Sequence, residues 1–512
     1  MCAPVRCGES ISQDNTCSSP VAADDQPMTV RSLILMIAFT LCVLLAQSRK
    51  LYDTDMFWQL KTGQLIWSQG GLVWNDPFTS THHGDPVPPI YWLCQLTYAG
   101  VFALGSWRLL HQFNVFMFMG AIFLAAYENR GRQASVFSQL FGICLAMLVM
   151  LPHCNVRAQT FSLVWLALLM LIVGAAWKPW QKLAAAALLF VVWQNLHPSL
   201  PLAIAYLGCR GAGEFLRAVW LREASRWKET ALLGAVALVC MVATPMGFSI
   251  FELSGYNAQI SRELGVSEWM PLWDPEILSL TTTAWLAVAI TVALLLYVGR
   301  AAELEDLTVC IGMTLLPIIA FRFALFWALA MVPIWIRWME LARPRELFAQ
   351  SGEDRLSKPV SAALCLGLLL IAIALPRLGS GGLFSQQLPL EGIRRLQEAG
   401  KAGVVYNGHA WGGPLIQAGY PNWQVAIDGR LYLYSSEEWK HYQEVAAGRI
   451  SVAEVVERYQ PDIFFLQPDF QREFCTRLRE DPGWREFYQD RTCSIFVAAD
   501  APPSESSPSI EE

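Results

Sequence analysis

Residues 51–95 read LYDTDMFWQLKTGQLIWSQGGLVWNDPFTSTHHGDPVPPIYWLCQ, and this stretch decides how the chain is organised. It is aromatic and polar, and charged residues and prolines interrupt it too often for a helix that crosses a bilayer. The apolar run Ser32–Gln47 precedes it, and further apolar runs follow from Leu109 onward. The stretch is therefore predicted to be a loop outside the membrane, held at each end by a transmembrane helix.

The composition of the whole chain favours an integral membrane protein. Of the 512 residues, 54% are hydrophobic and 16% are charged, whereas about a quarter of the residues in a soluble domain are charged. A run of roughly 18–20 apolar residues can cross the hydrocarbon as a helix, whose backbone groups bond to one another. We predict a mainly α polytopic membrane protein with about eleven such helices. The predicted spans are Ser32–Gln47, Leu109–Tyr127, Ser135–Leu151, Phe161–Trp177, Leu183–Leu196, Leu200–Phe215, Thr230–Ala243, Thr283–Val298, Leu307–Ala320, Ala324–Trp338 and Val360–Leu375.

The segment Ile90–Trp107 could cross the bilayer or lie on its surface, and the loop charges decide between the two. If it lies on the surface, most basic loop residues fall on one side of the membrane, which the positive-inside rule assigns to the cytoplasm. Counting it as a span would place those residues outside. The predicted cytoplasmic set is Arg130, Arg132, Lys178, Lys182, Arg210, Arg217, Arg222, Arg226, Lys228, Arg300, Arg337, Arg343, Arg345, Arg355 and Lys358, and only Arg49 and Lys50 conflict locally with this orientation.

Four parts are expected along the chain. Residues 1–30 are polar and lack the apolar core of a signal peptide, so we expect a disordered cytosolic leader. Residues 31–376 form the transmembrane domain, with residues 51–107 as its first extracytoplasmic loop. Residues 377–498 alternate helical and extended patterns, which predicts a small extracytoplasmic α/β domain. Residues 499–512, rich in Pro, Ser and Glu, are expected to be disordered.

The pattern of the C-terminal domain predicts strands and helices in alternation. Strands are expected at Gly403–Tyr406, Gln424–Ile427, Ile463–Leu466 and Ser494–Ala498, and helices at Glu437–Ala447, Val452–Tyr459 and Arg472–Glu480. The 13 cysteines form no CxxC pair and no metal-ligand spacing. Cys475 and Cys493 are the only two in this domain, and a disulfide between them is left open.

Several classes of function lack support in the sequence. The net charge of −6 and the absence of a basic tract argue against a nucleic-acid partner. No Walker A loop, GxGxxG unit or GxSxG elbow is present, so neither a nucleotide-sugar donor nor a serine hydrolase is indicated.

Polar residues at helix ends collect on the predicted outer face. They are Asp53, Asp55, His82, His83, Arg157, Asn195, His197, Glu268 and Arg322. Ionisable groups in or beside membrane helices are costly and therefore suggest function. Structural explanations stay open: the two aspartates can cap a helix over Met56–Trp67, the arginines can reach lipid head groups, and His197 can be an interface residue. Their collection on one face favours a site.

The stretch quoted above resembles the first outer loop of the GT-C superfamily, which comprises integral membrane glycosyltransferases that use polyprenyl-phosphate sugars. The resemblance lies in the acidic pair Asp53/Asp55, an amphipathic helix with Trp58 and Gly63, the turn Asp76-Pro77-Phe78-Thr79, and Trp92-Leu93-Cys94-Gln95. The segments NVRAQTFS, WQNLHPSLP, TPMGFSIFE, SEWMP, YNGHAWGGPLIQAGYP and VAIDGRLYLY are similar to a bacterial branch of these proteins. That branch usually has RPQ where this chain has Arg157-Ala158-Gln159, and often HG where it has His197-Pro198.

The resemblance implies chemistry for the outer-face residues. Transfer from a lipid-phosphate sugar needs a base for the acceptor hydroxyl and cations for the leaving phosphate. We predict Asp55 as the base with Asp53 as its partner, and Arg157, His197 and Arg322 at the donor phosphate. Further candidates for substrate contacts are His82, His83, Asn195, Glu268, Asp428 and Arg430. A divalent metal, Mg²⁺ or Mn²⁺, at the aspartate pair is left open, since Asp-x-Asp alone is a weak metal signature.

The resemblance implies an inverting glycosyltransferase of the cytoplasmic membrane, and the loop charges place its N-terminus in the cytoplasm. It would move a sugar from a polyprenyl-phosphate donor to a glycan, lipid or protein outside. One alternative is a lipid-linked sugar transporter or flippase, although the sequence has no internal repeats with interrupted helices. The other is a non-catalytic scaffold with this fold. In the C-terminal domain, Asn407 and His409 are also candidates, or the domain caps the site without taking part in the chemistry.

Overall fold

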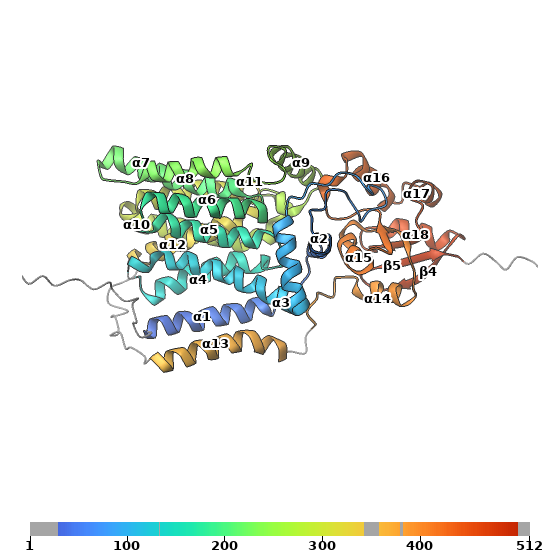
Figure 1. The fold of residues 1–512 in the computed structure, drawn as a ribbon, viewed down its shortest axis with the longest axis horizontal. Coiled ribbons are helices and arrows are strands. Elements are labelled where there is room, and N and C mark those ends of the chain that lie inside the picture. The colour runs from blue at the N-terminus through green and yellow to red at the C-terminus, as the bar shows by residue number, and fades with distance from the viewer. Residues whose placement is uncertain (1–28, 133, 343–357, 379–381, 500–512) are drawn as a thin grey trace, which may run out of the picture.

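The computed structural model describes residues 29–132, 134–342, 358–378 and 382–499. The predicted leader and tail lie almost entirely outside the described residues. A bundle of long helices forms one part of the molecule, and a small α/β domain lies at one end of that bundle (Figure 1).

The bundle consists of helices that lie side by side, together with the second part of α3. They are α1 (Val30–Gln47), α4 (Val136–Met150), α5 (Gln159–Gly174), α6 (Pro179–Leu196), α7 (Leu200–Leu216), α8 (Trp227–Cys240), α10 (Leu278–Val298), α11 (Leu304–Ile319), α12 (Ala324–Ala342) and α13 (Lys358–Leu378). Within the described residues, 5 segments are long and apolar enough to cross a membrane: Val30–Gln47, Trp92–Arg132, Val136–His153, Pro275–Ala301 and Phe321–Ala342. The chain is a multi-pass membrane protein, and the count of about eleven spans stays a prediction.

Helix α12 occupies the middle of the bundle and is apolar around most of its circumference, as a helix surrounded by others must be. Its tryptophans carry N–H groups that need partners in a medium of low polarity. Trp335 donates to the hydroxyl of Thr291 at 2.8 Å, and Trp327 donates to that of Thr314 at 2.9 Å. Neighbouring helices thus satisfy these two indoles, whereas the buried Nε1 of Trp338 has no hydrogen-bond partner among the described residues.

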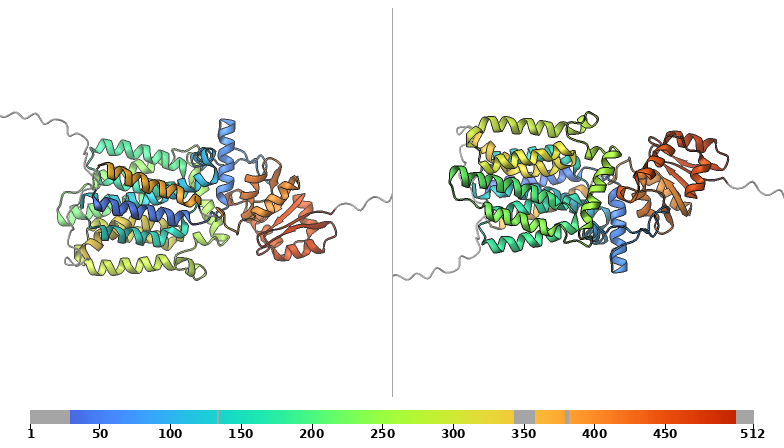
Figure 2. Two further views of the ribbon diagram at one scale, coloured as in Figure 1. Left: turned by 90° about the horizontal axis from the view of Figure 1, so that it is seen from below. Right: turned by 90° about the horizontal axis from the view of Figure 1, so that it is seen from above.

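Helices α2 (Asp55–Gln69) and α3 (Trp92–Tyr127) form the first loop and its return into the bundle. Helix α3 breaks at Gly105 and Ser106, where the φ of Ser106 is 59°, and the part before this break is the segment predicted to be a surface helix. Both α2 and that first part run across the end of the bundle (Figures 1 and 2). The two helices approach closely at Gly63, where a Cβ atom would lie 1.9 Å from the carbonyl oxygen of Gln95.

The C-terminal domain is a five-stranded sheet with helices on both faces, which confirms the predicted small α/β module. Its elements are α14 (Leu390–Glu398), β1 (Gly403–Asn407), α15 (Gly412–Gly419), β2 (Trp423–Val425), α16 (Ser436–Ala446), α17 (Val452–Tyr459), β3 (Ile463–Leu466), α18 (Arg472–Glu480), β4 (Trp484–Gln489) and β5 (Ser494–Ala498). The strand order is β2-β1-β3-β5-β4, with β2, β1 and β3 parallel and the remaining pairs antiparallel.

The two cysteines of this domain lie on opposite faces of the sheet. Cys475 packs in the cluster that contains Phe464 and Phe496, whereas Cys493 belongs to the cluster that contains Phe465. Side chains of successive strand residues point to opposite faces, so the sheet itself separates the two thiols. Both are free and buried, and the disulfide left open by the sequence does not form.

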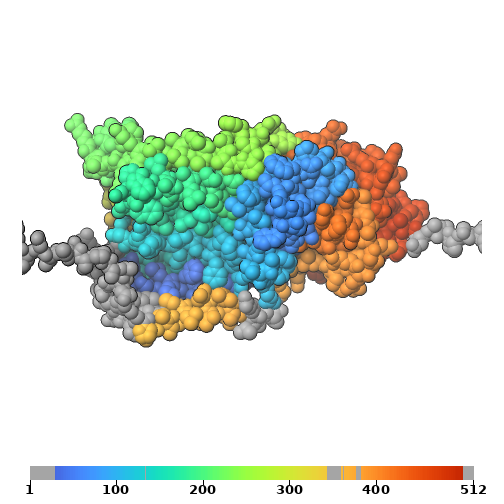
Figure 3. All heavy atoms as spheres, viewed as in Figure 1, coloured from blue at the N-terminus to red at the C-terminus, as the bar shows by residue number. Residues whose placement is uncertain are grey.

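The first loop and the C-terminal domain share one packed core. The loop pairs with β2, because Ser80 donates its backbone N–H to Val425 at 2.9 Å and Val425 donates to Phe78 at 3.0 Å. Apolar residues of α2 and α15 pack in the same buried cluster. Figure 3 shows the first loop in continuous contact with the domain. This packing holds residues 428–432 against the start of α2.

Candidate active site

A polar cavity of about 140 Å³ lies where the end of the bundle, α2 and the C-terminal domain meet. Its charged and titratable lining residues are Asp55, Tyr91, Arg157, His197, Glu268, Arg322 and Tyr432. These residues come from separate loops at one end of the bundle and from the C-terminal domain. The structure therefore brings the predicted base and all three predicted phosphate ligands together in one cavity.

The two predicted acidic residues have different positions. Asp55 is the first residue of α2 and lines the cavity, where its Oδ1 accepts a hydrogen bond from the indole of Trp58 at 3.1 Å. Asp53 lies behind it and accepts the backbone N–H of Asp55 at 2.9 Å. Burial and the neighbouring charge of Asp53 raise the pKa of Asp55 to about 7. Asp55 is thus able to take up or release a proton near neutral pH.

A row of alternating charges connects Asp53 to the far wall of the cavity. The Nε of Arg157 lies 3.0 Å from Asp53, and its Nη1 is ion-paired with Glu268. Burial alone would raise the pKa of Glu268, but Arg157 and Arg322 lower it to about 2. Glu268 therefore stays ionised and neutralises part of the positive charge, so its role in this structure is to hold Arg157.

Arg322 is the arginine best placed to bind an anion. It belongs to the short helix η7 (Phe321–Phe323) between α11 and α12, and its guanidinium lies 4.3 Å from the centre of the Trp269 ring. Within the described residues, no carboxylate forms an ion pair with it. A guanidinium held over an aromatic ring can still direct its N–H groups at a phosphate.

His197 is a neutral hydrogen-bonding group and not a cation. It caps the end of α6, its Nδ1 lies 2.8 Å from the hydroxyl of Ser162, and its ring stacks on Tyr91 at 5.8 Å between centroids. Burial, followed by the charges of Arg322 and Arg157, lowers the pKa of His197 to about 3. The contact with Ser162 leaves Nε2 as the ring nitrogen that can meet a ligand in the cavity.

The remaining candidates from the sequence lie outside the cavity. His82 bridges Asp85 and Glu438 at 2.9 Å each, and His83 contacts Gln424 at 3.3 Å, so both attach the first loop to the C-terminal domain. Asn195 accepts the indole N–H of Trp92 at 2.8 Å and also donates to two backbone carbonyls. In the C-terminal domain, the side-chain amide of Asn407 donates to the backbone carbonyls of Gly408 and Ile427. The ring of His409 is enclosed by Trp439, Tyr442 and Phe470.

Asp428 and Arg430 form a buried ion network and do not face the cavity. Arg430 lies 2.6 Å from Asp428 and 2.7 Å from Asp76 of the first loop, and both carboxylates are fully buried. Loss of Arg430 would leave two buried carboxylates without a counter-charge, whereas loss of one carboxylate would leave a one-to-one ion pair. The network fixes the turn that contains Gly429, and a Cβ atom at Gly429 would lie 2.2 Å from Asp55 Oδ1.

This close contact makes Gly429 a sensitive test of the position of Asp55. Replacing Gly429 by Ala pushes the Asp55 carboxylate away from its position, and we expect turnover to fall about a hundredfold with the fold retained. Steady-state transfer rates and a thermal unfolding curve measure the two effects. The matched control is Gly71→Ala, because a Cβ there meets nothing within 4 Å. Equal activity of the two variants would contradict the placement of Asp55 in the site.

At the acidic pair, Oδ2 of Asp53 lies 3.0 Å from Nε of Arg157, and Asp55 is the member of the pair that lines the cavity. The described parts of the chain contain no group of three or more His, Cys, Asp or Glu side chains arranged to hold a metal ion. A divalent metal at this pair stays a prediction.

Sequence reasoning missed several residues of the cavity wall. Tyr91, Trp269, Tyr432 and Gly429 line it, although none was a candidate from the sequence. Tyr91 precedes the WLCQ motif, and Trp269 lies within SEWMP, so both were inside segments already singled out. Tyr432 and Gly429 lie within VAIDGRLYLY, which was also singled out, but only the packing of the C-terminal domain shows that they reach α2.

No protein-family model and no curated protein matches the sequence, so the similarity to known proteins rests on the structure. Among solved structures, the oligosaccharyltransferase AglB from Archaeoglobus fulgidus, in complex with an inhibitory peptide and a dolichol-phosphate, aligns with a TM-score of 0.55 over 92% of this chain and 74% of that chain, at 11% identity. The apo form of the A. fulgidus oligosaccharyltransferase aligns with a TM-score of 0.54 over 85% of this chain and 69% of that chain, also at 11% identity.

The arabinofuranosyltransferase AftD from Mycobacteria aligns with a TM-score of 0.52 and 14% identity, over 93% of this chain. These aligned proteins are GT-C glycosyltransferases. The chain has the GT-C fold. It spans only 40% of the length of AftD. The GT-C fold thus accounts for almost the whole chain, and the resemblance noted in the first loop is confirmed at the level of the fold.

Proposed function

We propose that this protein is a membrane glycosyltransferase that transfers a sugar from a polyprenyl-phosphate donor to an acceptor outside the cytoplasm. The observation that carries the proposal is one cavity containing both a carboxylate with a pKa near neutrality, Asp55, and an arginine, Arg322, that forms no ion pair with a carboxylate in the described parts of the chain. The fold supports the reaction class, since the aligned proteins include an arabinofuranosyltransferase and an oligosaccharyltransferase.

The proposed reaction is a single displacement. The acceptor hydroxyl oxygen attacks the anomeric carbon of the donor sugar while Asp55 takes the hydroxyl proton. The bond between that carbon and the phosphate oxygen breaks, and the electron pair leaves with the polyprenyl phosphate. Arg322 and Arg157 stabilise the charge of the leaving phosphate, and His197 can donate a hydrogen bond to it. Attack from the face opposite the leaving group inverts the anomeric configuration.

The proposed orientation puts the cavity at the outer face of the cytoplasmic membrane, with the N-terminus inside. The basic loops of the positive-inside argument support it, because connections such as η1 (Glu128–Arg132) and the turn between α7 and α8 lie at the end of the bundle away from the C-terminal domain. A lipid donor suits this position, since its phosphate lies at the bilayer surface. Labelling of an engineered cysteine in the C-terminal domain by an impermeant reagent on whole cells tests the orientation.

The proposed base predicts how the rate depends on pH. Asp55 acts only when ionised, so kcat/KM should rise through a midpoint near its pKa of about 7 and level off above it. The negative charge of Asp53 is one cause of that raised pKa. Asp53→Asn should therefore move the midpoint to a lower pH. A pH–rate profile of both proteins checks the prediction, and an unchanged or higher midpoint in the variant would show that another group limits the rate.

The central experiment separates the enzyme from its two alternatives. Purified full-length protein is incubated with a panel of radiolabelled polyprenyl-phosphate sugars and a cell-envelope extract, and transfer is measured. A transporter would instead move the lipid-linked sugar across liposomes with no acceptor present, and a scaffold would do neither. Transfer of no sugar in the panel would shift the assignment to the scaffold.

A further inference from the structure

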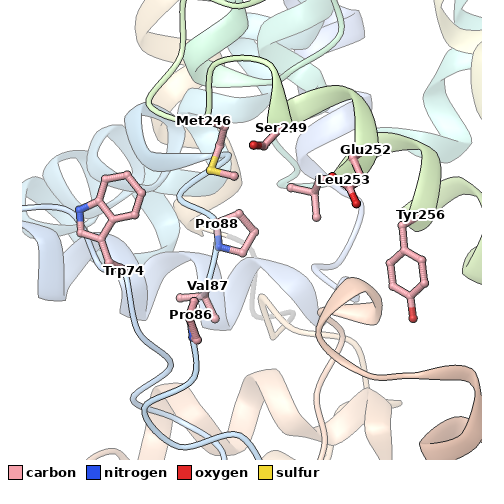
Figure 4. Close-up of a pocket in the computed structure, with 9 residues that line it drawn as sticks. All are labelled: Trp74, Pro86, Val87, Pro88, Met246, Ser249, Glu252, Leu253 and Tyr256. Atoms are coloured by element: carbon pink, nitrogen blue, oxygen red, sulfur yellow. The ribbon is translucent and has the colours of Figure 1, made fainter.

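A second and larger cavity lies beside the candidate active site, between the first loop and α9 (Ser249–Glu263). Its volume is about 440 Å³, within the range of roughly 300–1,000 Å³ that is common for small-molecule sites. Figure 4 shows Glu252 and Leu253 projecting from α9 toward Pro88 and Val87 of the first loop. We refer to this cavity, lined also by Trp74, Pro86, Met246, Ser249 and Tyr256, as the α9 groove.

Helix α9 contributes residues to the walls of both the α9 groove and the active-site cavity. Tyr256 lines the groove, and the next residue, Asn257, lines the active-site cavity together with Ser261 one turn later. The hydroxyl of Tyr256 donates to the backbone oxygen of Tyr434 at 2.9 Å, which fixes α9 against the segment that also supplies Tyr432 to the active site. The α9 groove and the active-site cavity therefore lie on neighbouring faces of α9.

The two cavities differ in chemistry. The active-site cavity contains Arg157 and Arg322, which suit a phosphate, whereas the groove contains the carboxylate of Glu252 and no basic residue among its lining. Glu252 has no ion-pair partner in the described parts of the chain. An anionic lipid head group would be repelled there. The remaining wall is apolar apart from Ser249, and Trp74 contributes a half-exposed indole.

An aromatic and apolar wall with one carboxylate and one hydroxyl suits a neutral molecule that has apolar faces and hydroxyl edges, and a sugar ring has both. The C–H faces of a sugar pack on an indole, and its hydroxyls donate hydrogen bonds to a carboxylate. We infer that the α9 groove binds the saccharide end of a glycan acceptor, an inference that rests on the proposed glycosyltransferase function. The acceptor hydroxyl next to Asn257 then loses its proton to Asp55 as its oxygen bonds to the donor sugar.

Direct binding tests the groove without requiring transfer. Full-length protein in nanodiscs is exposed separately to three fractions of the cell envelope, namely released saccharides, lipids and peptides, and the bound species are identified by native mass spectrometry. We expect retention of saccharides, with an apparent affinity about tenfold lower in Trp74→Ala and in Glu252→Gln. Glu252→Gln changes an exposed side chain, so it remains a folded test if Trp74→Ala is unstable.

The controls carry the same chemical changes elsewhere. Trp180→Ala removes an exposed indole at the start of α6, and Glu276→Gln neutralises an exposed carboxylate outside the groove, so both should bind like the parent protein. Retention of lipids or peptides in place of saccharides, or equal saccharide binding by parent and groove variants, would overturn the inference. Asp55→Asn should still bind saccharides. Saccharide binding at the groove without transfer by the parent protein would contradict the proposed function alone.

Discussion

Asp55→Asn should lower the rate of sugar transfer about a thousandfold while leaving donor binding intact. The amide cannot accept the acceptor proton, and a positioned general base contributes roughly 10²–10⁴ to a rate. The substitution is nearly isosteric, and an Asn oxygen can still accept the indole hydrogen bond of Trp58 that holds this side chain. Single-turnover transfer and equilibrium binding of the radiolabelled donor separate the two quantities.

The control for this experiment is Asp469→Asn, which neutralises an exposed carboxylate of the C-terminal domain. It should transfer sugar at the parent rate. If Asp55→Asn instead lost donor binding in proportion to its rate, Asp55 would be a binding residue and another group would act as the base. A rate within a few-fold of the parent protein would remove Asp55 from the mechanism and favour the transporter or the scaffold.

Arg322→Gln should reduce kcat/KM for the lipid-phosphate donor about a hundredfold. A hydrogen bond to a charged group contributes roughly 1.5–3 kcal/mol, and no second unpaired guanidinium is available among the described residues of the cavity. Arg322→Lys should recover part of the loss, because it keeps the charge but not the planar fork that stacks on Trp269. Donor titrations at fixed acceptor concentration measure the effect.

Arg108→Gln provides the comparison for Arg322, since Arg108 is exposed near the break in α3 and does not line the cavity. Its donor kinetics should be unchanged. Should Arg322→Gln behave like Arg108→Gln, while Arg157→Gln is inactive, Arg157 would be the phosphate ligand. The ion pairs of Arg157 with Asp53 and Glu268 would then have to open when the donor binds.

Much of the candidate site could be predicted because its residues stand where a membrane protein rarely tolerates polar groups. Asp55, Arg157, His197 and Arg322 each follow or precede an apolar run, and the burial cost of such groups makes them conspicuous in the sequence. Asn195 is also a polar residue beside an apolar run, but its side chain has a structural role. It satisfies Trp92 and two carbonyls at a helix end, and a sequence pattern cannot distinguish a structural hydrogen bond from a ligand contact.

Within the C-terminal domain, most predicted elements match the structure, and the strand that was missed lies at the edge of the sheet. Strand β3 is buried at all four residues, and its apolar run gave the correct bounds. Strand β4 was missed, because as an edge strand with the sequence WREFYQ it keeps charged side chains in solvent and shows no alternation. Gly412 and Gly413 begin helix α15, where their missing side chains permit close packing against Ile427 and Thr54.

The ion network of Asp76, Arg430 and Asp428 has an evolutionary consequence. These residues come from segments about 350 positions apart in sequence, yet each carboxylate depends on the same guanidinium. A mutation that removes Arg430 would strand both carboxylates, so it can persist in a lineage only if the first half of the gene changes at Asp76 as well. Recombination should therefore yield poorly folded chimaeras when a first half that encodes Asp76 is joined to a second half that lacks Arg430.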